Sequence, residues 1–386
     1  MIQNLHKKGM GPKNVFESEI DFNTLSEVET LNTKLSIIQN KLQLFKNPYI
    51  GNKRKLIKKI IKTIDKYDIK YNSFLDLFAG SGFVSMAMKM LNKKVICNDI
   101  LYSSYINTYA FVLNKDIVLS EEEKNLLYKK NDNYKKFISR EYLDKFSEEE
   151  LVFMENYYWN AKEYPQVEKF AYAKQYLALS HLLNYIMEKC FVGGRLNKGQ
   201  ILAEYNYRVK HKRNKSKTSK SKEMNFKDIR WIPPLYTDDP NCHECFNFDA
   251  IYLLEEVQLP FDIDLCYIDP PYGGEQSDYF KMYKFFEHYL TEGESENGWS
   301  KAGSEKFTHN KNYESNFRRL IKASSFVPWL IISYNDSSWG NIEKIRKILL
   351  EYRNTVTIDN FSYSYNYRYQ SKNTKDTKEY LILACN

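Results

Sequence analysis

The sequence predicts an α/β protein whose mainly parallel sheet ends in an antiparallel edge and is interrupted by a mainly helical insertion. A strand, a glycine turn, a helix and a second strand follow one another between Ser73 and Asp99. Two further apolar runs, Leu265–Ile268 and Pro328–Ser333, have the length and composition of buried strands. The chain of 386 residues is long enough for one large α/β domain that carries an insertion.

The composition is that of a globular protein. Of the residues, 43% are hydrophobic and 27% charged, with only 14 Gly and 10 Pro. Six cysteines without a secretory leader favour a reducing compartment over a disulfide framework, so we expect a cytoplasmic protein. No segment approaches the roughly 18 consecutive apolar residues that a membrane span needs. These features argue against a disulfide scaffold, a membrane protein and a disordered chain.

Two amphipathic helices are expected at the start of the chain. Between Thr24 and Phe45 apolar residues recur at a spacing of three and four, and Thr24 with Glu27 has the pattern of a capping box. A second helix follows Gly51. The apolar stripe of the first helix suits packing on its own domain or pairing with a second copy, so we expect a monomer or a weak dimer.

The next elements form one βαβ unit. The apolar run Ser73–Phe78 leads into Ala79-Gly80-Ser81-Gly82, a helical pattern follows, and Lys94–Cys97 is the second strand. Residues 102–190 have a helical pattern without strand alternation. Residues 191–245 then break this pattern with glycine and proline pairs and a basic run.

Strand character returns in the last third of the chain. After the strand Leu265–Ile268 come a helix over Asp278–Tyr289, the strand Pro328–Ser333 and a helix near Ser337–Tyr352. The alternation in Thr355–Tyr369 and Glu379–Cys385 predicts an antiparallel hairpin. The expected organisation is an N-terminal helical extension over 1–46, a core domain over 47–110 and 246–386, and an inserted region over 111–245.

The net charge of +8 is concentrated in one segment. Between Arg208 and Lys222 there are eight Lys or Arg and no acidic residue. Such a run suits contact with the phosphates of a nucleic acid, and it equally suits a solvated loop. The residues in it that we take as candidates for nucleic-acid contact are Arg208, Lys210, Lys212, Arg213 and Lys215.

The glycine turn and the acid after the next strand suggest a nucleoside site. Gly80 and Gly82 let a ligand approach the backbone, and Asp99 follows a strand at a position where a carboxylate can bind both ribose hydroxyls. The third glycine of a dinucleotide motif is replaced by Ser85, so the turn fits a cofactor without phosphates. S-adenosylmethionine is such a cofactor. A turn used only for packing is the alternative.

The strongest signal is Asp269-Pro270-Pro271-Tyr272, directly after a predicted buried strand. Two prolines often merely end a strand, but an acid before them and an aromatic residue after them are unusual. With the loop Asp76-Leu77-Phe78-Ala79-Gly80-Ser81-Gly82, this motif resembles those of the D12 class of DNA adenine-N6 methyltransferases. The order of the motifs along the chain, with the insertion between them, is similar to that of the α-class.

The resemblance covers about residues 45–385 and implies further site residues. The stretch Phe45–Lys55 matches the family's N-terminal motif, which implies that Tyr49 and Lys53 face the cofactor. In the other two motifs, the resemblance implies the same for Asp76, Phe78 and Asp269. Arg195 and Asn197 loosely match a stretch of the family's DNA-recognising insertion. The family often has an Asp-Phe pair near the cofactor's adenine; here the stretch reads Asn247-Phe248-Asp249, so Asn247 and Asp249 are both candidates.

The resemblance also implies a fold and an activity. The fold would be the Rossmann-like mixed sheet of S-adenosylmethionine-dependent methyltransferases, with an inserted target-recognition region. The activity would be site-specific methylation of adenine N6 in double-stranded DNA with base flipping, without a metal. It implies a bacterial or phage protein, the modification enzyme of a restriction-modification system, with a cognate restriction endonuclease as a partner.

The residue types suit this chemistry. Adenine N6 is a poor nucleophile because its lone pair is delocalised into the ring. The Asp269 carboxylate and the Pro270 carbonyl can accept its two hydrogens, and Tyr272 can stack on a flipped base. The same acceptors suit cytosine N4, and RNA is an alternative substrate. A non-catalytic nucleic-acid-binding module and protein glutamine methylation remain further alternatives.

Overall fold

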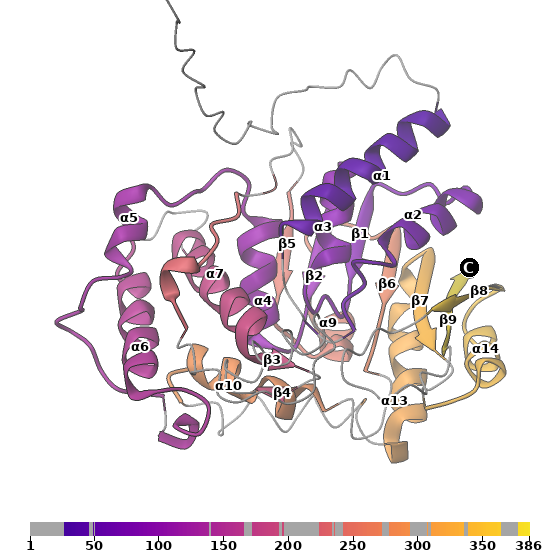
Figure 1. The fold of residues 1–386 in the computed structure, drawn as a ribbon. Helices are drawn as coiled ribbons and strands as arrows, with labels where there is room; N and C mark the ends of the chain where they lie inside the picture. The colour runs from indigo at the N-terminus through magenta and orange to yellow at the C-terminus, as the bar shows by residue number, and fades with distance from the viewer. Residues whose placement is uncertain are drawn as a thin grey trace, which may run out of the picture.

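A seven-stranded mixed sheet forms the centre of the computed structural model (Figure 1). The structure describes residues 27–45, 49, 51–138, 140–165, 172–192, 195–196, 224–233, 235, 242–271, 278–293, 307, 310–335, 339–363 and 377–386. The strand order is β5-β2-β1-β6-β7-β9-β8. The strands, in chain order, are β1 (Ser73–Asp76), β2 (Lys94–Asn98), β5 (Glu244–Phe246), β6 (Leu265–Ile268), β7 (Trp329–Asn335), β8 (Thr355–Tyr363) and β9 (Thr377–Cys385).

The predicted antiparallel edge is confirmed. Strands β5, β2, β1, β6 and β7 are parallel to one another, whereas β9 pairs antiparallel with β7 and with β8. Strand β5 was not predicted, and it begins at Glu244, inside the range expected for the insertion. Three residues are too few to show a strand period, and only pairing with β2 makes this segment a strand.

Alternation along the strands places one layer of helices on each face of the sheet. Phe74 and Tyr267 pack with one group of helices, whereas the neighbouring Leu75 and Cys266 pack with the other. The first group is α1 (Glu27–Gln43), α2 (Ile57–Lys66), α3 (Phe83–Met90), α4 (Tyr102–Thr108), α7 (Ala173–Cys190) and α10 (Tyr279–Leu290). The second group is α9 (Ala250–Glu256), α13 (Asn310–Ala323) and α14 (Ile342–Leu350).

The N-terminal helix packs on its own domain. Leu35, Ile38 and Leu42 of α1 are buried, as is Phe45, which directly contacts the ring of Phe83 edge to face. Thr24 of the expected capping box lies outside the described residues. The apolar stripe that suggested a second copy as a partner is therefore already covered by the chain itself.

The inserted helices share the core of the sheet. They extend the helical layer beyond α7 (Figure 1) and comprise η2 (Tyr109–Leu113), α5 (Glu121–Leu126), η3 (Arg140–Tyr142) and α6 (Glu148–Lys162). After α7 come a short hairpin, β3 (Phe191–Val192) with β4 (Arg195–Leu196), and η5 (Phe226–Asp228). Among the described residues no helix is long and apolar enough to cross a membrane.

The topology sets the position of a ligand site. From β1 the chain continues to β2 on one side, and later returns to place β6 on the other side of β1. The loops after these parallel strands diverge at their carboxyl ends and leave a crevice there. Asp76 ends β1, Asp99 follows β2 and Asp269 follows β6, so three carboxylates meet at this edge.

Candidate active site

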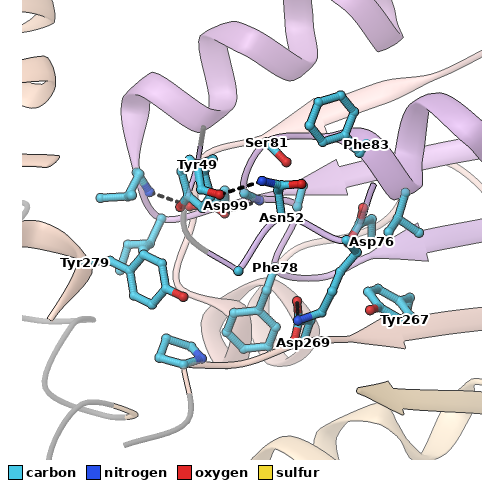
Figure 2. A pocket seen from close by; sticks show the side chains of 18 residues that line it. Tyr49, Asn52, Asp76, Phe78, Ser81, Phe83, Asp99, Tyr267, Asp269 and Tyr279 are labelled. Carbon is cyan, nitrogen blue, oxygen red and sulfur yellow. Dashed lines mark hydrogen bonds and ion pairs between the residues drawn. The ribbon is translucent and has the colours of Figure 1, made fainter. Parts of the chain in front are cut away.

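A pocket of about 640 Å³, including its open mouth, lies at this edge of the sheet. It is built by the segment before α2, the glycine turn, the ends of the three strands and the start of α10 (Figure 2). The residues expected from the sequence that line it are Tyr49, Lys53, Asp76, Phe78, Gly80, Asp99, Asp269 and Pro271. Residues from distant parts of the chain therefore meet in this pocket.

Asp99 forms one end of the pocket. Its Oδ2 accepts a hydrogen bond from the Gly80 backbone N–H at 2.7 Å, and its Oδ1 accepts one from Leu101 N–H at 2.8 Å. Burial raises the pKa of this carboxyl to about 7, although the two backbone hydrogen bonds act in the opposite direction. Each oxygen keeps a second lone pair, so the carboxylate is oriented by the backbone and still able to bind hydroxyl groups.

The glycine turn has a conformation that suits glycine. Gly80 has φ +52° and Gly82 has φ +75°. A Cβ on Gly80 would lie 3.1 Å from Cε1 of Tyr49, so the aromatic wall of the pocket approaches the bare backbone. A Cβ on Gly82 would lie 3.0 Å from Cγ2 of Thr108. Gly82 does not line the pocket, and its role is to allow α3 to start against α4.

The two oxygens of Asp76 have different surroundings. Oδ2 accepts a hydrogen bond from Ser85 Oγ at 2.6 Å, whereas Oδ1 is buried and has no hydrogen-bond partner among the described residues. Burial raises the pKa of this carboxyl to about 7, and the charges of Asp269 and Asp99 act in the same direction. A buried acceptor without a donor costs about 1–3 kcal/mol, so this oxygen is suited to a ligand that donates hydrogen bonds.

Lys53 and Asp269 form an ion pair in the pocket. Lys53 Nζ lies 3.0 Å from Asp269 Oδ2, and the two side chains are 5% and 16% exposed. Lys53 is fixed because its carbonyl accepts backbone hydrogen bonds from Leu56 and Ile57 at the start of α2. Pro270, next to Asp269, is buried. Tyr272, the last residue of the motif, lies outside the described residues.

The aromatic wall includes residues that the sequence did not identify. The ring of Tyr49 stacks on Tyr283 with centroids 4.5 Å apart, and lies 6.0 Å from Tyr279. Both partners are on α10, the helix that follows the Asp-Pro-Pro-Tyr loop. Their spacing of four residues was visible in the sequence, but it is the same as that of ordinary core aromatics. Tyr267, another member of the pocket wall, was read only as part of a buried strand.

Asn247 and Asp249 have different surroundings, and neither lines the pocket. Asn247 Nδ2 donates to the carbonyls of Asp99 and Ile100, at 2.7 and 3.0 Å, while its Oδ1 is buried without a hydrogen-bond partner within the described ranges. The Asp249 carboxylate caps α9 by accepting from the N–H groups of Ile251 and Tyr252. Asn247 thus holds the backbone beside Asp99, whereas Asp249 holds the start of a helix.

The residues proposed to contact nucleic acid are mostly outside the described part of the chain. Arg195 is described only as a member of β4, where it pairs with Val192. The other candidates, Asn197, Arg208, Lys210, Lys212, Arg213 and Lys215, lie outside the described residues, so their function stays a prediction.

The Cys242-His243-Glu244-Cys245 stretch has two cysteines and a histidine, which are residue types that bind metals, and it leads into the sheet, since Glu244 and Cys245 are in β5. His243 is buried, and its Nδ1 accepts a hydrogen bond from Val95 N–H at 3.2 Å. Cys245 is the register partner of Cys97 on β2. Within the described ranges no three His, Cys, Asp or Glu side chains are grouped as a metal site would need.

The fold and site define a class of protein: an α/β methyltransferase with a nucleoside-sized pocket at the carboxyl edge of its sheet. The family model of the D12 class N6 adenine-specific DNA methyltransferases matches residues 49–348. The chain belongs to this family, and it is therefore an adenine-specific DNA methyltransferase.

The similarity to two curated relatives extends over most of the length of each of them. The type II methyltransferase M2.HphI of Haemophilus parahaemolyticus is 26% identical over 313 residues, which are 80% of this chain and 89% of that protein. The type II methyltransferase M.NlaIII of Neisseria lactamica is 22% identical over 311 residues, which are 78% of this chain and 86% of that protein. The type II methyltransferase M.FokI of Planomicrobium okeanokoites matches over 51% of its length at 25% identity.

Proposed function

We propose that this enzyme transfers a methyl group from S-adenosylmethionine to adenine N6 at a specific site in double-stranded DNA, as the modification enzyme of a restriction-modification system. The observation that carries the proposal is the Asp269 carboxylate, held beside Lys53 at the end of β6 in a pocket whose other end is Asp99. An acceptor of this kind at the edge of a nucleoside pocket suits an exocyclic amine as the substrate.

The residues of the pocket fit S-adenosylmethionine. Asp99, oriented by two backbone amides, is placed for the ribose hydroxyls. The unpartnered Oδ1 of Asp76 suits the ammonium group of the methionine end, and Lys53 suits its carboxylate. Of the pair Asn247 and Asp249, Asn247 is the better candidate for a position near the cofactor's adenine, because its amide binds the backbone of Asp99 and its Oδ1 has no hydrogen-bond partner among the described residues. Asp249, in contrast, caps a helix.

In this proposal the protein contributes to the reaction by positioning the target amine and by placing a negative charge beside it. Bound S-adenosylmethionine supplies an electrophilic methyl group on a sulfonium. The Asp269 carboxylate and the Pro270 carbonyl accept the two N6 hydrogens and draw the nitrogen towards tetrahedral geometry, which localises its lone pair. Alignment of this kind can contribute about 7–11 kcal/mol. Lys53 holds the Asp269 carboxylate in one orientation, and the carboxylate stabilises positive charge that develops on N6.

Access to the base requires it to leave the duplex. Extrusion costs a few kcal/mol, and stacking of the flipped base on Tyr272 returns about 1–3 kcal/mol. We assign recognition of the surrounding sequence to the region 111–245, with the 47–110 and 246–386 segments as the catalytic domain. Arg195, Asn197 and the basic run from Arg208 are the candidates for DNA contact within it.

The relatives supply the biological setting of the proposal. The names of M2.HphI and M.NlaIII describe type II methyltransferases. By analogy we propose that this chain protects DNA from a cognate restriction endonuclease, in the cytoplasm of a bacterium or during phage infection. The family relation favours adenine N6 over the cytosine N4 and RNA alternatives.

The decisive experiment incubates the purified enzyme with tritiated S-adenosylmethionine and unmethylated genomic DNA. Nucleosides are then separated, and the modified sites are sequenced. We expect N6-methyladenine confined to one short sequence. Label in N4-methylcytosine, label in RNA alone, or binding of the cofactor without any transfer would each contradict the proposal.

A further inference from the structure

The hydroxyl of Tyr267 is a polar group in the pocket wall that the reaction described above does not use. Tyr267 lines the pocket on the side of Asp269 and Asp76 (Figure 2). The residue is 1% exposed, and its hydroxyl is buried without a hydrogen-bond partner in the described part of the chain. Nearly all buried polar side-chain atoms have a partner in the functional state, so an exception in a ligand pocket indicates a group that binds ligand.

The sheet fixes the position of this phenol. Tyr267 on β6 is the register partner of Asp76 on β1, and Asp269 follows two residues later. Register partners in a parallel sheet and residues two apart on a strand point to the same face. Packing also holds the ring, since it stacks on Phe74 with centroids 6.5 Å apart. Burial of the ring and its position on β6 therefore keep the phenol at the pocket wall.

A neighbouring hydroxyl does not satisfy Tyr267. Ser333 on β7 is near enough to the phenol to lower its pKa. Among the described residues, however, neither Ser333 Oγ nor the Tyr267 hydroxyl has a hydrogen-bond partner of normal geometry. A buried hydroxyl left in this state costs about 1–3 kcal/mol. That cost is recovered only if a group that enters the pocket accepts or donates a hydrogen bond.

Charge indicates which part of a ligand reaches this place. Burial raises the pKa of the Tyr267 phenol well above its ordinary value, so the group is a neutral donor at every physiological pH. The carboxylates of Asp269 and Asp76 raise the pKa of the same phenol further, whereas the ammonium group of Lys53, in the pocket wall and paired with Asp269, lowers it. The ammonium group carries three N–H donors, so Lys53 can bind a second anion beside Asp269. A neutral donor next to a cation favours an anion, whereas the free oxygen of Asp76 favours a cation.

We propose that the Tyr267 hydroxyl donates a hydrogen bond to the α-carboxylate of the methionine end of S-adenosylmethionine. The inference rests on the proposed use of this cofactor. Tyr267 then acts as a positioning residue: together with Lys53 and Asp76 it fixes the amino-acid end, and thereby the line between the sulfonium methyl group and the amine held by Asp269. The hydroxyl is therefore expected to lower the Kd of the cofactor, and to do so in the absence of DNA.

The test compares three ligands with the wild-type enzyme and with Tyr267→Phe. The ligands are S-adenosylmethionine, its decarboxylated analogue and 5′-methylthioadenosine, which lacks the whole amino-acid end, and calorimetric titration without DNA gives each Kd. Tyr267→Phe is expected to raise the Kd of S-adenosylmethionine about tenfold or more, because a hydrogen bond to a charged group is lost. The other two Kd values are expected to change less than about twofold.

Other patterns would overturn the proposal. An equal change for all three ligands would mean a general distortion of the pocket. A loss for S-adenosylmethionine and for the decarboxylated analogue, but not for 5′-methylthioadenosine, would assign the hydroxyl to the ammonium group instead. Failure of the wild-type enzyme to bind any of the three would contradict the proposed cofactor itself.

Stability without ligand provides an independent readout. Because the hydroxyl has no hydrogen-bond partner among the residues that the structure describes, Tyr267→Phe is expected to leave the thermal unfolding midpoint unchanged or to raise it. A lowered midpoint, or a variant that does not fold, would show that the hydroxyl already has a structural partner. Ser333→Ala is the matched control, and we expect it to change none of the three Kd values.

Discussion

The two ends of the pocket are built in different ways. At the end of β2, both oxygens of Asp99 are bound by the backbone N–H groups of Gly80 and Leu101. At the ends of β1 and β6, by contrast, one oxygen of Asp76 and the hydroxyl of Tyr267 have no hydrogen-bond partner among the described residues. The carboxylate at the first end is thus oriented before a ligand binds, whereas the second end presents polar groups that a ligand can satisfy.

The difference has a physical reason. Ribose hydroxyls are neutral, and a carboxylate that backbone donors already orient can bind them with its remaining lone pairs. The methionine end of the proposed cofactor carries charge, and positive charge develops on the proposed target amine. Buried groups of complementary charge stabilise the protein only when the ligand pairs with them. Substitutions at the β2 end should therefore damage binding and fold together, whereas those at the β6 end should affect chemistry or cofactor affinity with less damage to the fold.

The largest effect is expected at Asp269. Asp269→Asn keeps the shape of the side chain but removes the charge that stabilises N6, so kcat should fall about a hundredfold to a thousandfold while the Kd of S-adenosylmethionine changes little. Asp264→Asn is the matched control at the other end of β6, where the carboxylate accepts from Asn72 and Ser73 N–H. It should lower stability and leave kcat intact. Methyl-transfer assays measure kcat, and cofactor titrations measure Kd. A normal kcat in Asp269→Asn would contradict the assignment of Asp269 to the active site.

Tyr272 should have a smaller effect on the same step. Tyr272→Ala is expected to lower kcat about tenfold to a hundredfold through loss of stacking on the flipped base, with cofactor affinity retained. Tyr272→Phe keeps the ring and should be close to wild type. A larger loss in cofactor Kd than in kcat would place Tyr272 at the cofactor instead.

A substitution of Gly80 tests the end of the pocket where backbone N–H groups orient Asp99. Gly80→Ala puts a Cβ into a left-handed conformation, at about 1–2 kcal/mol, and against the ring of Tyr49. We expect a Kd for S-adenosylmethionine raised about tenfold and a lowered thermal unfolding midpoint. Gly340→Ala is the control, since a Cβ there meets only ordinary contacts, 3.6 Å or more away. Equal behaviour of the two variants would refute the close approach inferred for the turn.

The smallest effect is a pH dependence of cofactor binding. Burial raises the pKa of Asp76 to about 7, so below that pH the carboxyl is protonated and attracts an ammonium group less. The Kd of S-adenosylmethionine should therefore fall, by less than about tenfold, as the pH rises from about 6 to about 8. Asp99 has a similarly raised pKa, so Asp76→Asn is needed to isolate the effect. Titrations with this variant should show a flatter profile, and an unchanged profile would assign the dependence to another group.

Most of the site could be predicted because its motifs depend on local chain geometry. Gly80 and Gly82 are required by a turn with positive φ, and Asp269 and Asp99 are defined by their positions after strands. Such requirements involve only neighbouring residues and are visible in the sequence. The antiparallel edge was likewise predictable, because the alternation of β8 and β9 is a property of each segment.

Other parts became clear only in three dimensions. The segment Glu244–Phe246 is too short to show a period, and it is a strand because β2 offers it hydrogen bonds. Asp249 and Asn247 were equal candidates in the sequence. In the structure their contacts differ, because Asp249 caps α9 whereas Asn247 donates to the backbone carbonyl of Asp99. The helices α9 and α13, missed by the pattern analysis, pack on the second face of the sheet.

By itself, the sequence determined the order of the elements, the glycine turn, the Asp-Pro-Pro-Tyr motif and hence the family. Only the tertiary structure decided that Tyr279 and Tyr283 pack against Tyr49 and that Lys53 pairs with Asp269. It also decided that Tyr267 lines the pocket with a hydroxyl that no described residue hydrogen-bonds. The reason is the range of the interactions: backbone conformation depends on adjacent residues, whereas burial and pairing of side chains depend on segments that lie far apart in the chain.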